Sequence, residues 1–369
     1  MELVALGTLA GAITGGLLFT PLVRHWARRC DFVDHPGERK IHASPIAYGG
    51  GIAVALTIAL ALGAVWTFVT PRPFSWLVLL GAAGALVLGL VDDKIRLSPR
   101  AKLAGQFVLA IMAVAGGVRI TALIGDTLPM QAATVLWIVL ITNSFNLLDN
   151  MDGLCAGTAA IAAFVLGIVA VQTEQWAMVF PLAALCGACI GFLRYNRSPA
   201  SIFLGDAGSL LIGYLMACLT VLVTYYRYRE PSHLGLGIPI LVLAIPLYDT
   251  FSVIVIRLRE GRPIMRGDTS HFSHRLVDLG MTRRQAVTTI HLACLAIGLP
   301  ATVLGQLSES SGLLIVGQAC LVLTLVALLE HAGRARARGE TTGESFAAKA
   351  PAAPPAADSA SPNHAESNR

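Results

Sequence analysis

The chain has 369 residues, of which 55% are hydrophobic and only 13% are charged, with a formal net charge of +5 and a mean hydropathy of +0.68. Soluble globular proteins carry about 25% charged residues, so this composition excludes a soluble globular domain. Apolar runs close to the ~20 residues that a membrane-crossing helix needs recur along most of the chain. We therefore predict an all-α, polytopic integral membrane helical bundle.

Eleven apolar segments are predicted to cross the membrane. The first lacks a basic leader and a small-residue cleavage site, so we interpret it as a retained helix and not as a secretory signal. Together the segments form a predicted membrane-embedded domain over residues 1–330. In chain order they cover residues 3–23, 46–69, 74–91, 101–118, 132–148, 154–172, 177–193, 207–226, 234–258, 285–305 and 310–329.

The basic residues predict the orientation of these segments. If the N-terminus lies outside, every Lys and Arg falls in an inner loop or in the C-terminal tail except Arg72, Arg119, Arg227 and Arg229. Inner loops of membrane proteins are enriched in Lys and Arg. We therefore expect a multi-pass protein of the bacterial inner membrane with its N-terminus outside and its C-terminus in the cytoplasm. Residues 331–369 contain few large apolar residues and are predicted to be a disordered cytoplasmic tail.

Most acidic residues fall on the same inner side. Asp92 and Asp93 end the third predicted helix, where adjacent carboxylates repel each other unless a cation is nearby. They form either a solvated helix end balanced by Lys94 and Arg96, or an acid pair that faces Mg²⁺ or phosphate.

The end of the fifth predicted helix is unusually polar. Asn143, Asn146 and Asn150 share one helical face, and Asp149 and Asp152 lie beside it. Such a polar stripe does not contribute to packing against lipid, because burying polar groups at this depth costs free energy unless they pair or bind a ligand. A functional site is therefore the favoured interpretation.

Two further inner segments carry polar chemistry. Asp206 opens the eighth predicted helix between Gly205 and Gly208, either as a helix cap or with backbone amides that approach an anion. In the long basic loop, His271, His274 and Arg275 are typical of a phosphate clamp.

Zinc is a weaker interpretation of the two histidines, because no third soft ligand lies close by. Hard oxygen ligands for Mg²⁺ together with Arg and His suit phosphoryl transfer between a nucleotide and a lipid phosphate. An ion-coupled transporter is the alternative class, but its acids would lie near the bilayer midplane and not at one face.

These motifs occur in residues 39–51, 91–94, 143–153, 203–209 and 268–275. In this order they resemble the polyprenyl-phosphate N-acetylhexosamine-1-phosphate transferases, the superfamily of MraY and WecA. The eleven predicted spans are similar to the WecA branch, which transfers N-acetylglucosamine 1-phosphate, and not to the ten-helix MraY branch.

The resemblance implies transfer of a sugar 1-phosphate, in the WecA branch N-acetylglucosamine 1-phosphate, from a UDP-sugar to undecaprenyl phosphate. UMP is released, and the lipid product starts the synthesis of an envelope polysaccharide such as lipopolysaccharide O-antigen. The expected partners are the UDP-sugar, undecaprenyl phosphate and the lipid bilayer, with no nucleic acid; a homodimer stays open. One departure is Ser273, where the WecA branch has a histidine. The three consecutive histidines of the MraY branch are also absent, which argues against a UDP-MurNAc-pentapeptide donor and leaves another UDP-N-acetylhexosamine as an alternative.

The resemblance also implies roles for individual residues. Mg²⁺, or alternatively Mn²⁺, would be the cofactor. The implied metal ligands are Asn146 and Asp206. The implied catalytic residues are Asp92, Asp93, Asp149 and Asp152, with Asp92 a candidate base. The implied substrate-binding residues are His42, Asn143, His271, His274 and Arg275.

Overall fold

The computed structural model describes residues 1–35, 45–68, 74–121, 125–223, 225, 233–265 and 270–347, with side chains as far as Glu330. Its described part is almost entirely helical, which confirms the predicted fold class. Nine helices in this part are long and apolar enough to cross a membrane. They are α1 (Glu2–Arg29), α2 (Gly50–Phe68), α3 (Trp76–Ile95), α5 (Leu128–Leu148), α6 (Leu154–Gln172), α7 (Trp176–Asn196), α8 (Gly205–Leu222), α12 (Arg283–Ala301) and α13 (Glu309–Ala347).

The other two predicted spans differ from straight membrane helices. The fourth corresponds to α4 (Pro99–Ala115), which has 17 residues. The ninth is a pair, α9 (Ile238–Val242) and α10 (Ala244–Arg259), whose segments are bent by 70°. Of the eleven predicted spans, the described residues therefore hold nine long apolar helices, or ten if the bent pair is one span, and the remaining one corresponds to the shorter helix α4.

The bend between α9 and α10 has a local cause. Pro246 lies in the first turn of α10 and has no N–H to donate to the carbonyl of Val242. Proline is the commonest origin of a sharp kink in a helix. The hydropathy of the segment is continuous across the bend, so the pattern of apolar residues alone could not reveal it.

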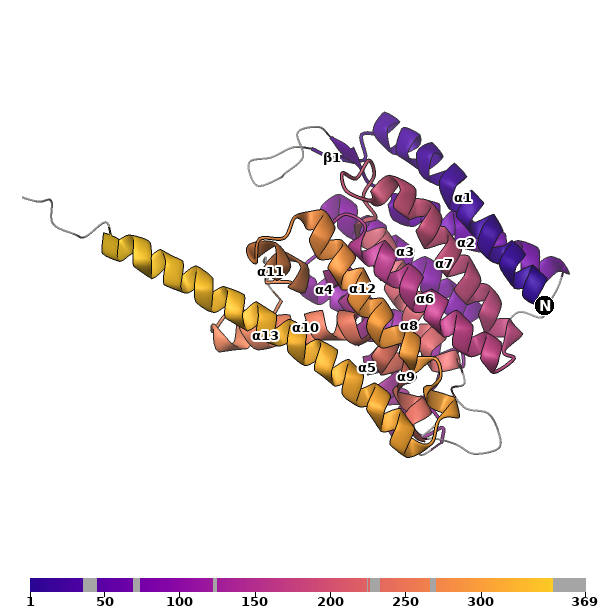
Figure 1. Cartoon of the computed structure of the whole chain (residues 1–369). Coiled ribbons are helices and arrows are strands. Elements are labelled where there is room, and N and C mark those ends of the chain that lie inside the picture. The colour runs from indigo at the N-terminus through magenta and orange to yellow at the C-terminus, as the bar shows by residue number, and fades with distance from the viewer. Residues whose placement is uncertain are drawn as a thin grey trace, which may run out of the picture.

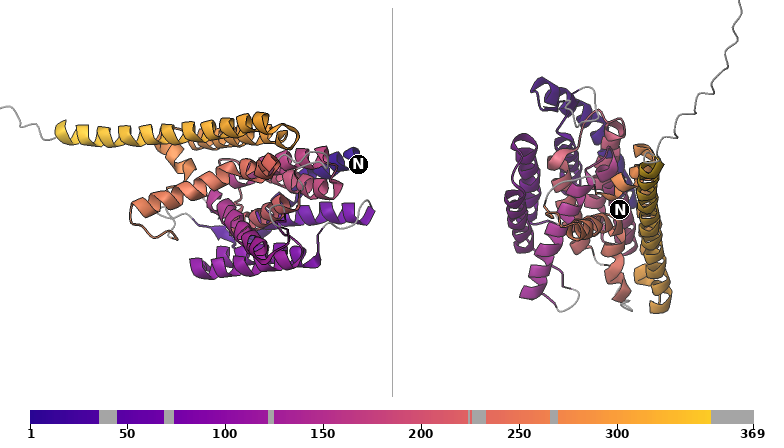
Figure 2. Two further views of the ribbon diagram at one scale, coloured as in Figure 1. Left: turned by 90° about the horizontal axis from the view of Figure 1, so that it is seen from below. Right: turned by 90° about the vertical axis from the view of Figure 1, so that its left-hand side faces the viewer.

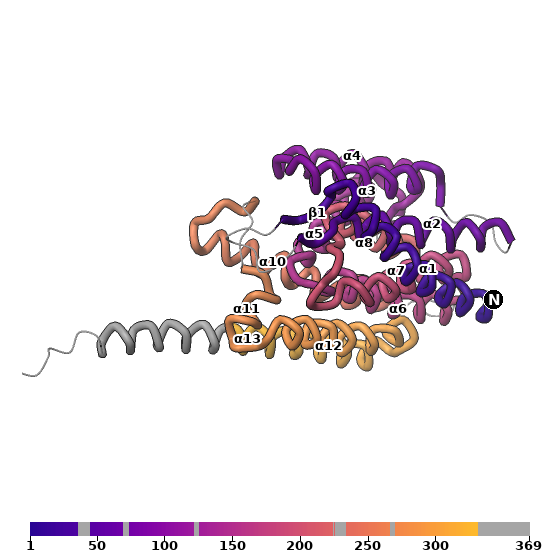
Figure 3. The backbone as a smooth tube through the Cα atoms, turned by 90° about the horizontal axis from the view of Figure 1, so that it is seen from above, coloured from indigo at the N-terminus to yellow at the C-terminus, as the bar shows by residue number. Residues whose placement is uncertain are grey.

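The helices form a bundle with a buried centre and a lipid-facing rim. In α6, α7 and α8, 72% to 78% of the apolar window is buried, against 11% in α13. Helix α1 packs along α7, and both α3 and α5 pack against α8. Figures 1 and 2 show α13 lying along the outside of the bundle, and Figure 3 shows α3 and α4 at the opposite edge from α12 and α13. The centre of the bundle is thus the scaffold on which the polar end is built.

The loop before α8 is fastened to the start of α2. The strands β1 (Val33–Asp34) and β2 (Ile46–Ala47) pair in antiparallel fashion. The Phe203 amide donates to the Ala47 carbonyl at 2.9 Å, and the Gly50 amide donates to the Phe203 carbonyl at 3.0 Å. These backbone hydrogen bonds fix where α8 begins.

Helix α13 extends beyond the C-terminal boundary predicted for the membrane domain. Helix α13 continues without a break from Glu309 to Ala347, so the predicted boundary at residue 330 falls inside a continuous helix. Ala, Arg and Glu are good helix formers, which is why the span can extend into a polar segment. Residues 348–369 of the predicted tail lie outside the described residues, and so does the predicted site residue His42.

Candidate active site

Two carboxylates from different helices converge on one ammonium group. Nζ of Lys102, on α4, lies 2.7 Å from Oδ2 of Asp92 on α3 and 2.9 Å from Oδ2 of Asp206 on α8. Oδ1 of Asp92 also accepts the amide of Leu97 at 2.7 Å. Because Asp92 is only 8% exposed, its charge depends on these partners. The three helix ends therefore enclose a small, strongly polar centre.

Asp93 has a different partner from its neighbour. Oδ1 of Asp93 accepts the amide of Asp206 at 2.7 Å, and Oδ2 accepts the amide of Ala207 at 3.1 Å. Gly205 has φ +74, and a Cβ there would lie 2.7 Å from Oδ2 of Asp93. A carboxylate on the free amides of a helix N-terminus is stabilising. The predicted catalytic Asp93 thus holds α8, and with it Asp206, in place.

The backbones of α3 and α8 approach very closely at this point. A Cβ added to Gly89 would lie 2.3 Å from Cα of Ala207. Only glycine permits such an approach. The position of the Asp92–Asp93 pair relative to Asp206 is therefore set by backbone contact as well as by hydrogen bonds.

Asn146 of α5 completes this centre, and Asn143 does not reach it. Nδ2 of Asn146 donates to Oδ1 of Asp206 and, at 2.9 Å, to Oγ of Ser209. Asn143 lies one turn deeper, where Oδ1 accepts from Nε2 of Gln106 at 3.3 Å. The predicted metal ligands Asn146 and Asp206 are thus brought together, whereas Asn143 pairs with a side chain of α4.

The turn after α5 carries two more of the predicted acids. Burial raises the pKa of Asp149 well above its ordinary value, and the nearby carboxylates of Asp206 and Asp93 raise it further. Asp152 instead accepts the amide of Ala200 at 3.1 Å through Oδ2. Asp149 therefore faces the acid centre, while Asp152 faces the loop between α7 and α8.

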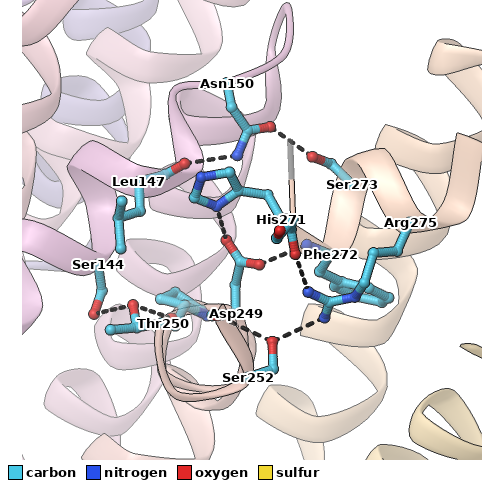
Figure 4. A network of polar contacts seen from close by, with 12 residues as sticks. Ser144, Leu147, Asn150, Asp249, Thr250, Ser252, His271, Phe272, Ser273 and Arg275 are labelled. Atoms are coloured by element: carbon cyan, nitrogen blue, oxygen red, sulfur yellow. Dashed lines mark hydrogen bonds and ion pairs between the residues drawn. The ribbon is translucent and has the colours of Figure 1, made fainter. Parts of the chain in front are cut away.

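A second polar network joins the short helix α11 (Phe272–Asp278) to α10 and to the end of α5 (Figure 4). Oδ2 of Asp249, on α10, lies 3.0 Å from Nδ1 of His271, and Oδ1 accepts the amide of Phe272 at 2.6 Å. Oγ of Ser273 donates to Oδ1 of Asn150 at 2.5 Å. Ser273, the departure from the family pattern, thus connects α11 to the turn that follows α5.

Arg275 is directed into the protein. Nε donates to Oε2 of Glu330 at 3.0 Å, and a terminal nitrogen donates to Oγ of Ser252 at 2.8 Å. The side chains of Arg275 and Glu330 are 6% and 3% exposed. In this arrangement Arg275 anchors α11 to α13. Its guanidinium is buried and already bonded to Glu330 and Ser252, so it is not exposed for the phosphate contact that was predicted.

His274 lies beside His271, with ring centroids 6.4 Å apart. Burial lowers the pKa of His274, and the charges of His271 and Arg283 lower it further, although Asp278 and Asp249 act in the opposite direction. The structure therefore places both predicted histidines together at the polar end, with His274 disposed to be neutral.

Lys102 and Asp249 are the principal site residues that the sequence analysis missed. Lys102 stands at the start of a predicted span, where a lysine is ordinary. Asp249 is an acid within the apolar run 234–258, and an ionisable residue at such a position is a recognised sign of function. That signal was available, but nothing in the sequence links Asp249 to His271.

The donor set can be compared with what Mg²⁺ requires. Among the described residues no group of three His, Cys, Asp or Glu side chains is arranged to hold a metal ion. Mg²⁺, however, usually binds through one or two carboxylates plus substrate phosphates. The oxygens of Asp206, Asp92 and Asn146 are hard donors, and the ammonium of Lys102 already marks a cation position between two of them. The residues fit a magnesium ion that is shared with a substrate.

Comparison with known proteins places the chain in a family. Residues 75–224 match the model of glycosyl transferase family 4. The chain is 33% identical to a probable undecaprenyl-phosphate N-acetylglucosaminyl 1-phosphate transferase of Bacillus subtilis, over 78% of this chain and 81% of that protein.

Two further relatives agree with this match. The chain is 32% identical to decaprenyl-phosphate N-acetylglucosaminephosphotransferase of Mycolicibacterium smegmatis, over 89% of each protein. It is 27% identical to undecaprenyl-phosphate alpha-N-acetylglucosaminyl 1-phosphate transferase of Escherichia coli K12, over 75% of this chain and 77% of the relative. With an acid and amide centre assembled from α3, α4, α5 and α8, the chain belongs to the family of polyprenyl-phosphate N-acetylhexosamine 1-phosphate transferases.

Proposed function

We propose that this chain transfers N-acetylglucosamine 1-phosphate from UDP-N-acetylglucosamine to undecaprenyl phosphate, with release of UMP. The relatives named above carry out sugar-phosphate transfer to polyprenyl phosphates, as their names state. The observation that carries the proposal is the convergence of Asp92, Lys102 and Asp206 at one end of a membrane bundle. A phosphotransferase that joins a soluble nucleotide to a lipid needs its polar centre at such an end.

The acceptor phosphate acts as the nucleophile in this proposal. A phosphate monoester has a second pKa near ~6 and is largely dianionic at neutral pH, so it needs no strong base. One of its oxygens attacks the β-phosphorus of the UDP-sugar, a new P–O bond forms, and the bond to the bridging oxygen breaks so that UMP leaves. Catalysis of this kind is mostly positioning and electrostatic stabilisation.

The residues of the site divide this work. Mg²⁺, held by Asp206, Asp92 and Asn146 when bound, would neutralise charge on the diphosphate. Lys102 supplies a second positive charge at the same place. His271 is oriented by Asp249 through Nδ1, which leaves Nε2 to donate to a phosphate oxygen when the ring carries both protons. Asp149, which faces the acid centre, would border the nucleotide, whereas Asp152 holds the loop between α7 and α8 through the amide of Ala200.

We place this site on the cytoplasmic side of the bacterial inner membrane. The ends of α3, α5 and α7 and the starts of α4, α6 and α8 meet at the polar end. The loops at this end carry nearly all of the basic residues, which supports a cytoplasmic location. A nucleoside diphosphate does not cross a bilayer unaided because of its charge, so the site must face the compartment that supplies the UDP-sugar.

One assay tests the proposal. The purified full-length chain is incubated with Mg²⁺, undecaprenyl phosphate and, separately, UDP-N-acetylglucosamine, UDP-N-acetylgalactosamine or UDP-MurNAc-pentapeptide, and UMP is measured. We expect UMP with UDP-N-acetylglucosamine, and none when the lipid or the metal is omitted. Absence of UMP with every donor would overturn the enzymatic proposal, and UMP with a different donor alone would overturn the proposed sugar.

The same assay separates two routes of transfer. Direct attack requires the lipid before any UMP appears. A two-step route through a covalent aspartyl intermediate would release one equivalent of UMP from the UDP-sugar alone and leave labelled protein. We expect no release without lipid.

A further inference from the structure

A cavity of about 1150 Å³ lies beside the acid centre, between α1, α7, α12 and the loop that leads to α8. Its lining is rich in arginine and contains one carboxylate, that of Asp152. The arginines are Arg24, Arg194, Arg197 and Arg284. No residue of the Asp92–Lys102–Asp206 centre lines it, and neither does His271, so the cavity is separate from the place where phosphoryl transfer is proposed.

The four arginines have no carboxylate partner among the described residues. Arg24 donates to Oγ of Ser201 at 2.9 Å, and Arg284 donates through Nε to the carbonyl of Ser198 at 2.9 Å. Arg194 contacts the face of Tyr195, whose ring centroid is 5.9 Å from the guanidinium carbon. Arg194, Arg197 and Arg284 are exposed, and guanidinium groups gathered at one cavity create a positive potential that attracts an anion. Arginine is the side chain that best matches the oxygens of a phosphate.

The deeper walls of the cavity are apolar. Ile190 and Leu193 of α7 and Val287 of α12 line it below the arginines. Ile190 is 41% exposed although it belongs to a membrane-spanning helix. The lining therefore combines arginines near the polar end with Ile190 and Val287, which lie about one helical turn further into the bundle.

The level of the arginines corresponds to the lipid headgroups. Trp26 lies half a turn beyond Arg24 on α1 and is 51% exposed. Exposed tryptophans of membrane proteins gather at the boundary between hydrocarbon and headgroups. Basic pockets between helices at this depth are suited to anionic lipid headgroups.

We infer that this cavity binds one anionic membrane phospholipid, with its phosphodiester among Arg194, Arg197 and Arg284 and an acyl chain along α7 and α12. Residues 197–201 form part of the wall, and Asp152 holds Ala200 in that segment. The bound lipid would brace the loop that positions α8. Undecaprenyl phosphate shares the anionic head and apolar chain, but its phosphate must reach the separate acid centre.

Native mass spectrometry of the purified full-length chain tests the inference. Palmitoyl-oleoyl phosphatidylglycerol and the matching phosphatidylcholine are offered in equal amounts, and the retained lipid is counted. We expect one phosphatidylglycerol, with a preference of about a hundredfold, since each of the three basic residues near the membrane surface contributes roughly a factor of five. The variant Arg194→Gln/Arg197→Gln/Arg284→Gln should lose most of this preference.

Matched variants and a competitor make the result decisive. The variant Arg28→Gln/Arg29→Gln/Arg259→Gln removes three exposed arginines outside the cavity lining and should keep the preference. If the cavity triple variant fails to fold, the single variant Arg194→Gln should still weaken the preference about fivefold. An unchanged preference in the cavity variants, or no preference in the wild type, overturns the inference. Displacement of phosphatidylglycerol by equimolar undecaprenyl phosphate overturns the assignment to a phospholipid.

Discussion

Nδ1 of His271 lies 3.0 Å from Oδ2 of Asp249, and the two side chains are 7% and 1% exposed. A carboxylate on one ring nitrogen of a histidine fixes both the tautomer and the orientation of the ring. The same carboxylate accepts the amide of Phe272, so Asp249 also sets where α11 begins. Asp249 is therefore a positioning residue for His271.

Replacement of Asp249 should lower activity. A hydrogen bond that involves a charged group contributes about 1.5 to 3 kcal/mol, so Asp249→Asn should reduce kcat by about 10- to 100-fold with a smaller change in KM. A loss of thermal stability with unchanged kcat in the folded fraction would show that Asp249 is structural only.

Replacement of Asp206 should abolish transfer without unfolding the protein. Asp206→Asn removes one of the two carboxylates that surround Lys102, and we expect at least about a thousandfold loss of UMP release. The matched control is Asp126→Asn, at an exposed acid of the opposite loops that pairs with Arg119. Equal activity of the two variants would contradict the assignment of the acid centre.

The two members of the aspartate pair should respond differently. Asp93→Ala removes the acceptor of two amides at the start of α8, and loss of such a cap costs about 1 kcal/mol of stability. A lower melting temperature, measured in detergent, is therefore expected for Asp93→Ala. Asp92→Asn keeps the shape of a side chain paired with Lys102 and should affect activity much more than melting. A reversed pattern would contradict the roles given to the pair.

His274 should make stability depend on pH. Its pKa in the folded protein is lowered by burial and by the charges of His271 and Arg283, so the unfolded chain takes up a proton more readily than the folded chain. Stability is then complete above the unfolded pKa of about 6.5 and is lost as the pH falls toward the lowered value. The melting temperature should drop less between pH 7.5 and 5.5 in His274→Gln than in wild type. His25→Gln, at an exposed position of α1, serves as the control.

Composition and charge were sufficient to predict a membrane bundle, because hydropathy and helix length follow directly from the bilayer. The bend before α10 escaped prediction, since Pro246 sits within an unbroken apolar run. A proline in such a run is compatible with either a straight or a broken span. The structure shows the broken form, with α9 and α10 bent by 70°.

The contacts of the candidate site were also predictable only in part. Asn146 and Asp206 were predicted to act together, and the structure places them in contact. The partner of Arg275 could not be predicted, because Glu330 lies 55 residues further along the chain. The residue type of Arg275 suggested that it binds phosphate. In the structure its guanidinium is buried and already neutralised by Glu330. Pairings between distant helices depend on how the bundle packs, and a single sequence does not carry that information.

The ion pair between Arg275 and Glu330 has a consequence for the order in which the protein is made. Glu330 lies on α13, which follows α11 in the chain, while Arg275 belongs to the segment that holds His271. Until α13 has been translated and inserted, the guanidinium of Arg275 lacks its partner and α11 lacks its anchor. A chain that stops before Glu330 would possess every acid of the Asp92–Lys102–Asp206 centre and still lack the anchor of the segment that holds His271.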